Sequence, residues 1–295
     1  MLALFFTASL LAGIRQPVQP PDNGPVHALD AGLRRIIAAS GAEVAVAYRT
    51  LDGRTSLFID ADKSVHAAST MKVPVMIELF TQARAGALTL DDPLPVVNTF
   101  RSLVDGSPYA LATGDASDAE IIAALGRTLP LRTLCEAMIT RSSNFATNLL
   151  IERLGIERIR RTVASLGADG MHVVRGVEDQ KAFDAGLINT TTARALLILL
   201  ERIANNRAVD PGSDADMVRI LARQTLSPDA IAAGVPSGTR VAHKTGSITR
   251  IHHDAAIVFA PVPYVLVVLT RGIADEGTSA RVMASVSKAV YESAR

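Results

Sequence analysis

A serine and a lysine three positions apart are the first residues in this chain whose spacing suggests chemistry. Ser69 and Lys72 open an apolar stretch that predicts a helix, and residues three apart lie side by side on a helix. First-turn N–H groups and the helix dipole favour developing negative charge there. A base beside a serine can make its hydroxyl a nucleophile, and a lysine can be that base when its surroundings lower its pKa. The pair suggests an acyl-transfer site, although an N-cap followed by a solvated lysine has the same spacing.

Two further short motifs carry groups that suit such a site. Ser142-Ser143-Asn144 lies where one predicted helix ends and another begins, and it offers a hydroxyl and a carboxamide. Lys244-Thr245-Gly246 ends a predicted strand, where a cation and a hydroxyl can bind a carboxylate and glycine leaves room for a ligand. Simpler interpretations remain open: a serine of the first motif could cap the following helix, and Lys244 could be an exposed charge.

An acidic residue lies on the longest segment without clear periodicity, residues 170–190. Loops of that length inside a compact domain are usually functional or disordered. Glu178, in the run Arg175-Gly176-Val177-Glu178-Asp179, could position a water molecule. It could equally pair with Arg175 at the surface.

In this order the motifs resemble the signature of the penicillin-recognising serine enzymes, which is Ser-x-x-Lys, Ser-Asp-Asn and Lys-Thr-Gly. The acidic loop with Glu178 points to the class A β-lactamases within that group. The resemblance runs from about Val26 to the C-terminus. It implies a small-molecule β-lactam substrate and catalysis without a metal or an organic cofactor.

The resemblance also implies a role for each catalytic residue. Ser69 would attack the lactam carbonyl and form an acyl-enzyme. Lys72, in contact with Ser69, would help to remove its proton, with Glu178 acting through a water as the competing base. The backbone N–H groups of Ser69 and Ser247 would form the oxyanion hole. Ser142 would relay a proton to the departing nitrogen, and Glu178 would then activate the water that releases Ser69.

Substrate binding is implied for the remaining motif residues. Asn144 would hold the side-chain amide of the substrate. Lys244 and Thr245 would bind its carboxylate, and Gly246 and Ser247 would lie beside them on the strand. Two other enzymatic or binding functions share these motifs: a D-Ala-D-Ala peptidase or esterase of the same fold, and a penicillin-binding sensor that does not hydrolyse its adduct.

The chain departs from the family pattern at several positions. Ser143 replaces the usual aspartate, which is mainly a scaffold hydrogen-bonder, so the local packing should differ. Gly176 and Val177 precede Glu178, and Ala182 stands where an asparagine is usual, so no carboxamide from that position would help to hold the hydrolytic water. Tyr109 is the candidate for an aromatic rim of the cleft.

Strands are expected at both ends of the chain around a helical middle. The pattern predicts helices over 26–40 and 279–293, and mostly helices between 69 and 206. It predicts strands over 43–48, 55–59, 239–246, 255–259 and 264–269. We therefore expect an α/β (α+β) fold: an antiparallel sheet built from N- and C-terminal segments, flanked by helices, with an inserted all-helical lobe. The catalytic domain would span 26–295, with an α/β lobe over 26–66 and 213–295 and a helical lobe over 67–212.

Composition and the first residues bound the remaining possibilities. The chain has 295 residues, is 48% hydrophobic and carries a net charge of +1, which suits a large core and argues against nucleic-acid binding. Cys135 is the only cysteine, so no internal disulfide can form, and its apolar surroundings favour a buried position. His252, His253 and Asp254 could in principle bind a metal, but no further cluster completes a ligand set.

The N-terminal 25 residues are interpreted as an export signal followed by a Pro-rich spacer. The apolar run over 2–14 is too short to span a membrane. We therefore expect an exported protein, periplasmic or secreted, with no stable membrane insertion after signal removal. A monomer is expected.

Overall fold

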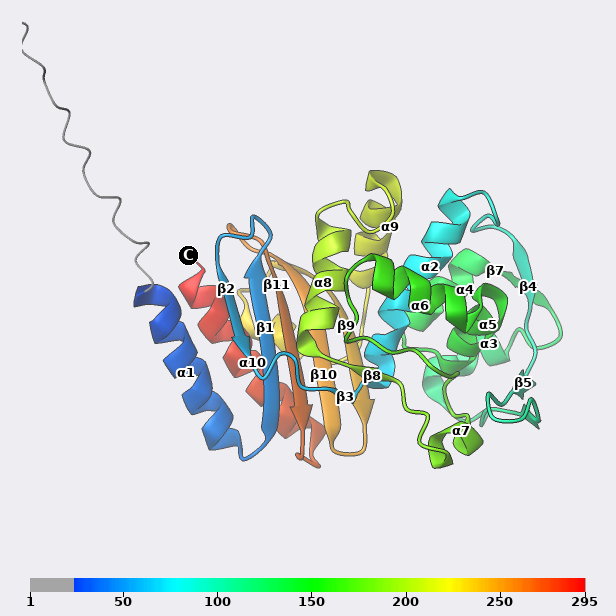
Figure 1. Cartoon of the computed structure of the whole chain (residues 1–295), viewed down its shortest axis with the longest axis horizontal. Helices are drawn as coiled ribbons and strands as arrows, with labels where there is room; N and C mark the ends of the chain where they lie inside the picture. Colours follow the sequence, from blue (N-terminus) through cyan, green and yellow to red (C-terminus); the bar gives the residue numbers. More distant parts are fainter. Residues whose placement is uncertain (1–23, 295) are drawn as a thin grey trace, which may run out of the picture.

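A five-stranded antiparallel sheet divides the molecule, and strands from both ends of the chain build it. The computed structural model describes residues 24–294, so residues 1–23 of the expected signal and spacer (1–25) lie outside them. The strand order is β2-β1-β11-β10-β9 (Figure 1). The strands are β1 (Glu43–Thr50), β2 (Ser56–Ile59), β9 (Arg240–Ile248), β10 (Ile251–Phe259) and β11 (Tyr264–Arg271).

The side chains of each central strand alternate between two hydrophobic cores. Along β1, Val44 and Val46 belong to one core, whereas Ala45 and Ala47 belong to the other. Successive residues of a strand point to opposite faces, so this strand must be covered on both sides. The same alternation continues along β11, which pairs with β1 over its whole length.

Helices from the chain termini cover one face, and the helical lobe covers the other. Helix α1 (Gly24–Ser40) packs against α10 (Glu276–Ser293) on the first face (Figure 1). Helix α8 (Ala193–Ala204) packs on β1, β10 and β11 from the opposite side. Strand β9 is the edge of the sheet, and its residues Thr245 and Ser247 line a cleft.

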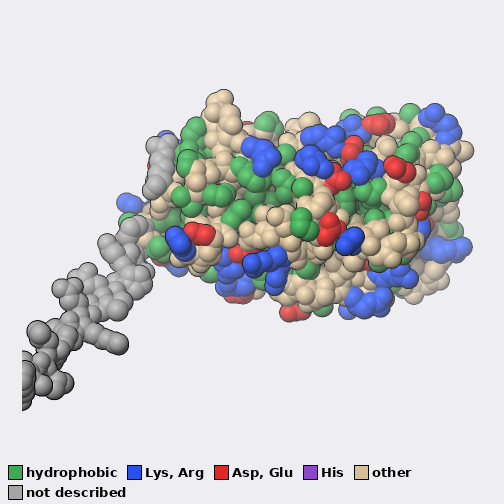
Figure 2. All heavy atoms as spheres, turned by 90° about the horizontal axis from the view of Figure 1, so that it is seen from above, with side chains coloured by type: hydrophobic (Ala, Val, Ile, Leu, Met, Phe, Trp, Pro, Cys, Tyr) green, Lys and Arg blue, Asp and Glu red, His purple; other side chains and the backbone are tan. Residues whose placement is uncertain are grey.

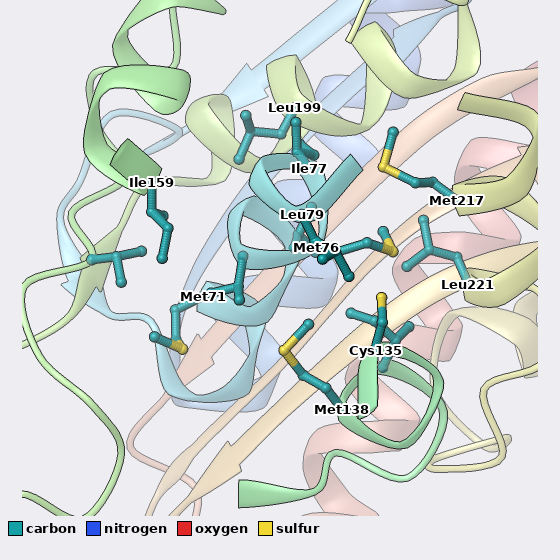
Figure 3. Close-up of a cluster of buried hydrophobic side chains, with 14 of the residues drawn as sticks. Met71, Met76, Ile77, Leu79, Cys135, Met138, Ile159, Leu199, Met217 and Leu221 are labelled. Atoms are coloured by element: carbon teal, nitrogen blue, oxygen red, sulfur yellow. The ribbon is translucent and has the colours of Figure 1, made fainter. Parts of the chain in front are cut away.

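Helix α2 (Lys72–Arg84) is the central helix of the helical lobe and is almost wholly buried. It packs against α4 (Leu131–Thr140), α5 (Asn144–Leu154), α6 (Ile156–Ser165) and α9 (Pro211–Leu221). Sulfur-containing side chains pack in the core between these helices, among them Met76 of α2, Cys135 of α4 and Met217 of α9 (Figure 3). The buried position of Cys135 confirms the expectation from its sequence context.

Short elements complete the chain. The remaining helices are α3 (Ala119–Ile122) and α7 (Gln180–Asp184), with 3₁₀ turns at Ala68–Met71, Ala116–Asp118 and Ile231–Gly234. The remaining strands are β3 (Val65–His66), β4 (Pro93–Pro95), β5 (Phe100–Arg101), β6 (Pro108–Tyr109), β7 (Thr128–Pro130) and β8 (Thr190–Thr191).

The predicted α/β (α+β) architecture is confirmed, and the main omission is helix α9. Its start carries a strong signal, because Asp210 caps the helix and Pro211 follows in its first turn. No helix within residues 24–294 combines the length and the apolarity needed to cross a membrane. The face in Figure 2 shows Lys and Arg side chains interspersed with Asp and Glu.

Candidate active site

Ser69 lies in the 3₁₀ turn Ala68–Met71, which leads directly into α2. The preceding residue, Ala68, has a φ of 46°, a conformation that costs energy for a residue with a Cβ. The Ala68 N–H donates to His66 Nδ1 at 2.9 Å, which helps to hold this conformation. The turn is thereby fixed at the junction of the two lobes, with the Ser69 side chain half-buried.

Lys72 is fully buried, and its amine points to the segment between α4 and α5. Nζ donates to Ser142 O at 2.6 Å, to Ser142 Oγ at 3.1 Å and to Asn144 Oδ1 at 2.8 Å. No hydrogen bond to the Ser69 hydroxyl is formed in the described structure. An ammonium group can only donate, and these three oxygens satisfy its donors.

Burial is what prepares Lys72 to act as a base. Removal from water disfavours the ammonium form and lowers the pKa of Lys72 to about 7, against the opposing charges of Asp118, Asp115 and Glu178. Near neutral pH a large fraction of the amine is therefore unprotonated. A neutral amine has a lone pair and can accept the proton of a nearby serine.

Ser142 Oγ lies between two buried lysines. It accepts from Lys72 Nζ at 3.1 Å and from Lys244 Nζ at 3.2 Å. Its φ of 60° places the residue in the left-handed region, and such strain recurs at functional sites. Burial, and then the charge of Lys72, hold the pKa of Lys244 well below its ordinary value. With its oxygen oriented by two donors, the Ser142 hydroxyl keeps its own proton available to a substrate.

Asn144 joins Lys72 to Glu178. Its Oδ1 accepts from Lys72 Nζ, and its Nδ2 donates to Glu178 Oε1 at 2.9 Å. A carboxamide has a second lone pair and a second N–H, so both ends can still bind a substrate amide. The alternative pairing of Glu178 is wrong, because Arg175 donates instead to the Leu187 and Gly176 carbonyls.

Asn148, one turn further along α5, fastens the loop that carries Glu178. Its Oδ1 accepts the Val177 N–H at 2.7 Å, and its Nδ2 donates to Val177 O at 3.0 Å. The Tyr109 hydroxyl accepts from the same Nδ2. Tyr109 thus lies behind the loop and outside the cleft lining, so its expected place on the cleft rim is wrong. Asn148 stands four residues after Asn144, a spacing that could have revealed it.

A second fastening holds the loop just beyond Glu178. Asp179 is buried and accepts from Ser102 Oγ at 2.8 Å and from the Leu103 N–H at 2.9 Å. It also caps α7 by accepting from the Ala182 N–H. Fixed on both sides, Glu178 itself has a φ of 60° and an exposed side chain.

The aspartate missing from the second motif is supplied by another segment. Ser143 caps α5 through its Oγ. The same hydroxyl donates to buried Asp118, which also accepts the Phe145 N–H at 3.1 Å. The expected difference in local packing is thus confirmed, with the carboxylate coming from residue 118. Sequence reasoning could not find Asp118, because it lies far from the motif along the chain.

Replacing Asp118 by alanine is expected to lower the free energy of unfolding by about 2–3 kcal/mol, because two buried donors lose a charged acceptor. Urea unfolding would measure it. Asp169→Ala, at an exposed aspartate, is the control and should change stability by less than about 0.5 kcal/mol. Equal effects of the two changes would contradict the assigned role.

Gly246 allows β9 to approach the nucleophile. A Cβ atom on this residue would lie 2.9 Å from Ser69 N and 3.1 Å from Ala68 Cβ. The next residue, Ser247, is thereby placed beside the nucleophile, and both line the cleft. This close approach suits an oxyanion hole made from the Ser69 and Ser247 backbone N–H groups.

Gly246→Ala is expected to lower the rate of Ser69 acylation about 10- to 100-fold, because small displacements of reacting groups have effects of this size. The burst of chromophore release on mixing with a chromogenic cephalosporin would measure it. Gly32→Ala is the matched control, since a Cβ there meets nothing within 4 Å. An unchanged burst rate in Gly246→Ala would show that the contact with Ser69 can relax.

Two hollows meet at Ser69. One of about 730 Å³ is lined by Ser142, Thr245, Ser247 and the acidic side chains Asp115, Asp229 and Glu276. The other, of about 280 Å³, extends under the loop and is lined by Asn144, Glu178, Val177 and Phe183. Ser69, Asn144 and Ser247 line both. The predicted site residues Ser69, Ser142, Asn144, Glu178, Thr245 and Ser247 line these hollows, while Lys72, Lys244 and Gly246 contact members of the set from within the protein.

The polar side chains at the start of β10 form hydrogen bonds within the protein. Asp254 pairs with His243 Nδ1 at 2.9 Å, and His252 Nδ1 lies 2.7 Å from Ser279 Oγ. His253 is buried between the carbonyls of His66 and His252, and burial lowers its pKa to about 4. Within residues 24–294 no group of three or more His, Cys, Asp or Glu side chains could hold a metal ion.

Comparisons with known proteins agree with this geometry. Residues 28–294 match the model of the family described as the beta-lactamase enzyme family. A beta-lactamase of Mycobacterium tuberculosis is 26% identical over 258 residues, which cover 82% of this chain and 73% of that protein. The crystal structure of a beta-lactamase from Chitinophaga pinensis superposes with a TM-score of 0.79 at 21% identity, covering 91% of this chain and all of that one. The structure of PBP-A gives a TM-score of 0.73 at 25% identity, covering 89% and 95%.

Proposed function

The chain belongs to the beta-lactamase enzyme family, and from this premise we propose that it is a serine β-lactamase of the class A type. It opens the lactam ring of penicillins and cephalosporins through an acyl-enzyme on Ser69. A water activated by Glu178 then releases the product. Neither step requires a metal or an organic cofactor, since protein side chains supply each proton transfer.

Acylation uses the groups gathered around Ser69. The neutral form of Lys72 takes the hydroxyl proton, either directly or through Ser142, and Ser69 Oγ bonds to the lactam carbonyl carbon. The carbonyl oxygen gains negative charge, which the Ser69 and Ser247 N–H groups bind. When the C–N bond breaks, Ser142 gives its proton to the leaving nitrogen. Lys244 and Thr245 hold the carboxylate of the substrate throughout.

The observation that carries the proposal is the position of Glu178. It lines the 280 Å³ hollow together with Ser69, and its Oε1 accepts from the carboxamide that also binds Lys72. This hollow is large enough for a water molecule beside the ester bond. A carboxylate that takes a proton from such a water acts as a general base for deacylation. Glu178 therefore supports turnover in addition to acylation.

Hydrolysis of a chromogenic cephalosporin by the purified protein tests this function. Ser69→Ala, purified identically, serves as the blank for contaminating activity. Intact-mass measurement in parallel should find a transient increase by the mass of the drug and a return to the free mass. An absence of both turnover and adduct in the wild type would refute the proposal.

A second candidate is a penicillin-binding protein whose acyl adduct persists. It is favoured by one observation: the exposed Glu178 side chain accepts only one hydrogen bond from the described residues, and Ala182 offers no second carboxamide. A weakly held base would position the hydrolytic water poorly. The similarity to PBP-A is compatible with this function. In the mass experiment, an adduct that remains for hours would favour it over the β-lactamase.

Export is part of the proposal and rests on the apolar run over residues 2–14 followed by the Pro-rich spacer. The protein would act as a monomer in the periplasm or outside the cell, where β-lactams are encountered. N-terminal sequencing of the protein recovered from its native compartment would find the start of the mature chain. A retained Met1 would contradict the export proposal.

A further inference from the structure

Lys244 is fully buried, and the acceptors around its amine are uncharged oxygens. Its Nζ donates to Ser142 Oγ at 3.2 Å, to Gln224 Oε1 at 3.2 Å and to Thr245 O at 2.8 Å. Within residues 24–294 no carboxylate forms an ion pair with it. Asp254 acts on it only at longer range, because its two oxygens bind His243 Nδ1 and the Ile231 N–H. Burial and the charge of Lys72 lower the pKa of Lys244, and an anion entering the cleft would favour its ammonium form.

Gln224 contacts both residues that would hold the substrate carboxylate. In addition to Lys244, its Oε1 accepts the Thr245 N–H at 3.3 Å and the Thr245 hydroxyl at 3.4 Å. The Thr245 N–H can only donate, so the amide of Gln224 must present its oxygen to it. The opposite end, Nε2, is buried and has no partner in the described structure. The orientation of Gln224 is therefore set by Lys244 and Thr245 alone.

The backbone at Gln224 is anchored to the same helix end as the second motif. Its N–H donates to Leu221 O at the end of α9, and the next residue, Thr225, donates through N–H and hydroxyl to Thr140 O. Thr140 is the last residue of α4, which leads directly into Ser142. Gln224 and Ser142 thus approach Lys244 from two segments that are tied together.

On the basis of the proposed function, we propose that Gln224 is a positioning residue that directs Lys244 and Thr245 toward the substrate carboxylate and brings no negative charge of its own to the subsite. A glutamine provides an acceptor oxygen without a negative charge. A glutamate at this position would pair with Lys244 and repel the incoming carboxylate.

The test compares a chromogenic cephalosporin bearing a free C4 carboxylate with its C4 methyl ester. Gln224→Glu should raise KM for the acid about tenfold or more, keep kcat within about threefold, and change KM for the ester less than about twofold. Gln224→Met, which has a similar length and no acceptor, should raise KM for the acid by a smaller factor. Ala164→Glu adds the same charge at an exposed position of α6, away from the hollows that contain Ser69, and should leave both substrates unaffected.

The outcomes separate the inference from the proposed function. Equal changes for acid and ester in Gln224→Glu, or an unchanged KM for the acid, would overturn the positioning role. Thermal unfolding and the acylation rate measured by intact mass identify a variant that has lost its fold, and Gln224→Met then provides the comparison. A wild-type protein that reacts with neither compound would refute the proposed function itself.

Discussion

Replacement of Glu178 by glutamine is expected to yield a protein that is acylated and remains acylated. The amide matches the carboxylate in size, but it cannot take a proton from the hydrolytic water. Turnover should fall about 10³-fold while the acylation rate stays within about tenfold of the wild type. Intact-mass spectra collected after mixing with a penicillin would follow both steps, because the adduct and the free protein are resolved.

A glutamate outside the cleft provides the matched control. Glu157 is exposed on α6 and pairs with Arg160, so Glu157→Gln removes the same charge far from the hollows that contain Ser69. Its adduct should clear at the wild-type rate. If the adduct of Glu178→Gln also clears at that rate, Glu178 is not the base for deacylation.

Loss of the Lys72 amine should affect the first half of the reaction. Lys72→Met is expected to slow acylation about 10³-fold, since the hydroxyl of Ser69 loses its base. Lys72→Arg should be equally slow, because a guanidinium remains protonated. In Glu178→Gln, where the water-borne route is removed, acylation should rise with pH to a plateau, with a midpoint at or somewhat below pH 7 because the charge of Glu178 also favours the ammonium form of Lys72. One pH unit below that midpoint about a tenth of the lysine is neutral, so the rate should be about tenfold lower.

The direction of this pH dependence follows from the lowered pKa. The ammonium form dominates below about pH 7 and cannot accept a proton, so the acid limb marks its titration. Asp118 is the carboxylate that most favours the ammonium form, and Asp118→Asn keeps an acceptor for Ser143 and Phe145. It should therefore move the midpoint to lower pH. A midpoint that does not respond to Asp118→Asn would assign the limb to another group.

The fold could be predicted largely from periodicity and turn signals. The strands near both termini alternate or form β-branched runs, and their number and antiparallel arrangement follow from them. Helix α9 was missed although Asp210 and Pro211 mark its start. Strand β10 begins at Ile251, earlier than its apolar run, because His252, His253 and Asp254 find polar partners inside the protein. Local patterns do not reveal such partners.

The site could be predicted where motifs are contiguous and not where contacts cross the chain. Ser69, Ser142 and Lys244 were found because each belongs to a short motif. Asp118 and Gln224 act through a single buried oxygen contact with a residue distant in sequence, and nothing in their neighbours distinguishes them. The position of the Lys72 amine likewise depends on which acceptors the fold supplies. It bonds to the Ser142 segment instead of to Ser69.

The pairing of β1 with β11 has a consequence for biogenesis. Glu43 lies opposite Arg271, so the first strand of the chain pairs with the last, and this edge of β1 stays open until β11 has been made. A nascent or truncated chain that ends before Tyr264 leaves β1 with open backbone groups, which are a template for association with other chains. Contacts of such long range also slow folding. A chain that lacks β11 is therefore expected to associate with other chains more readily than the complete chain.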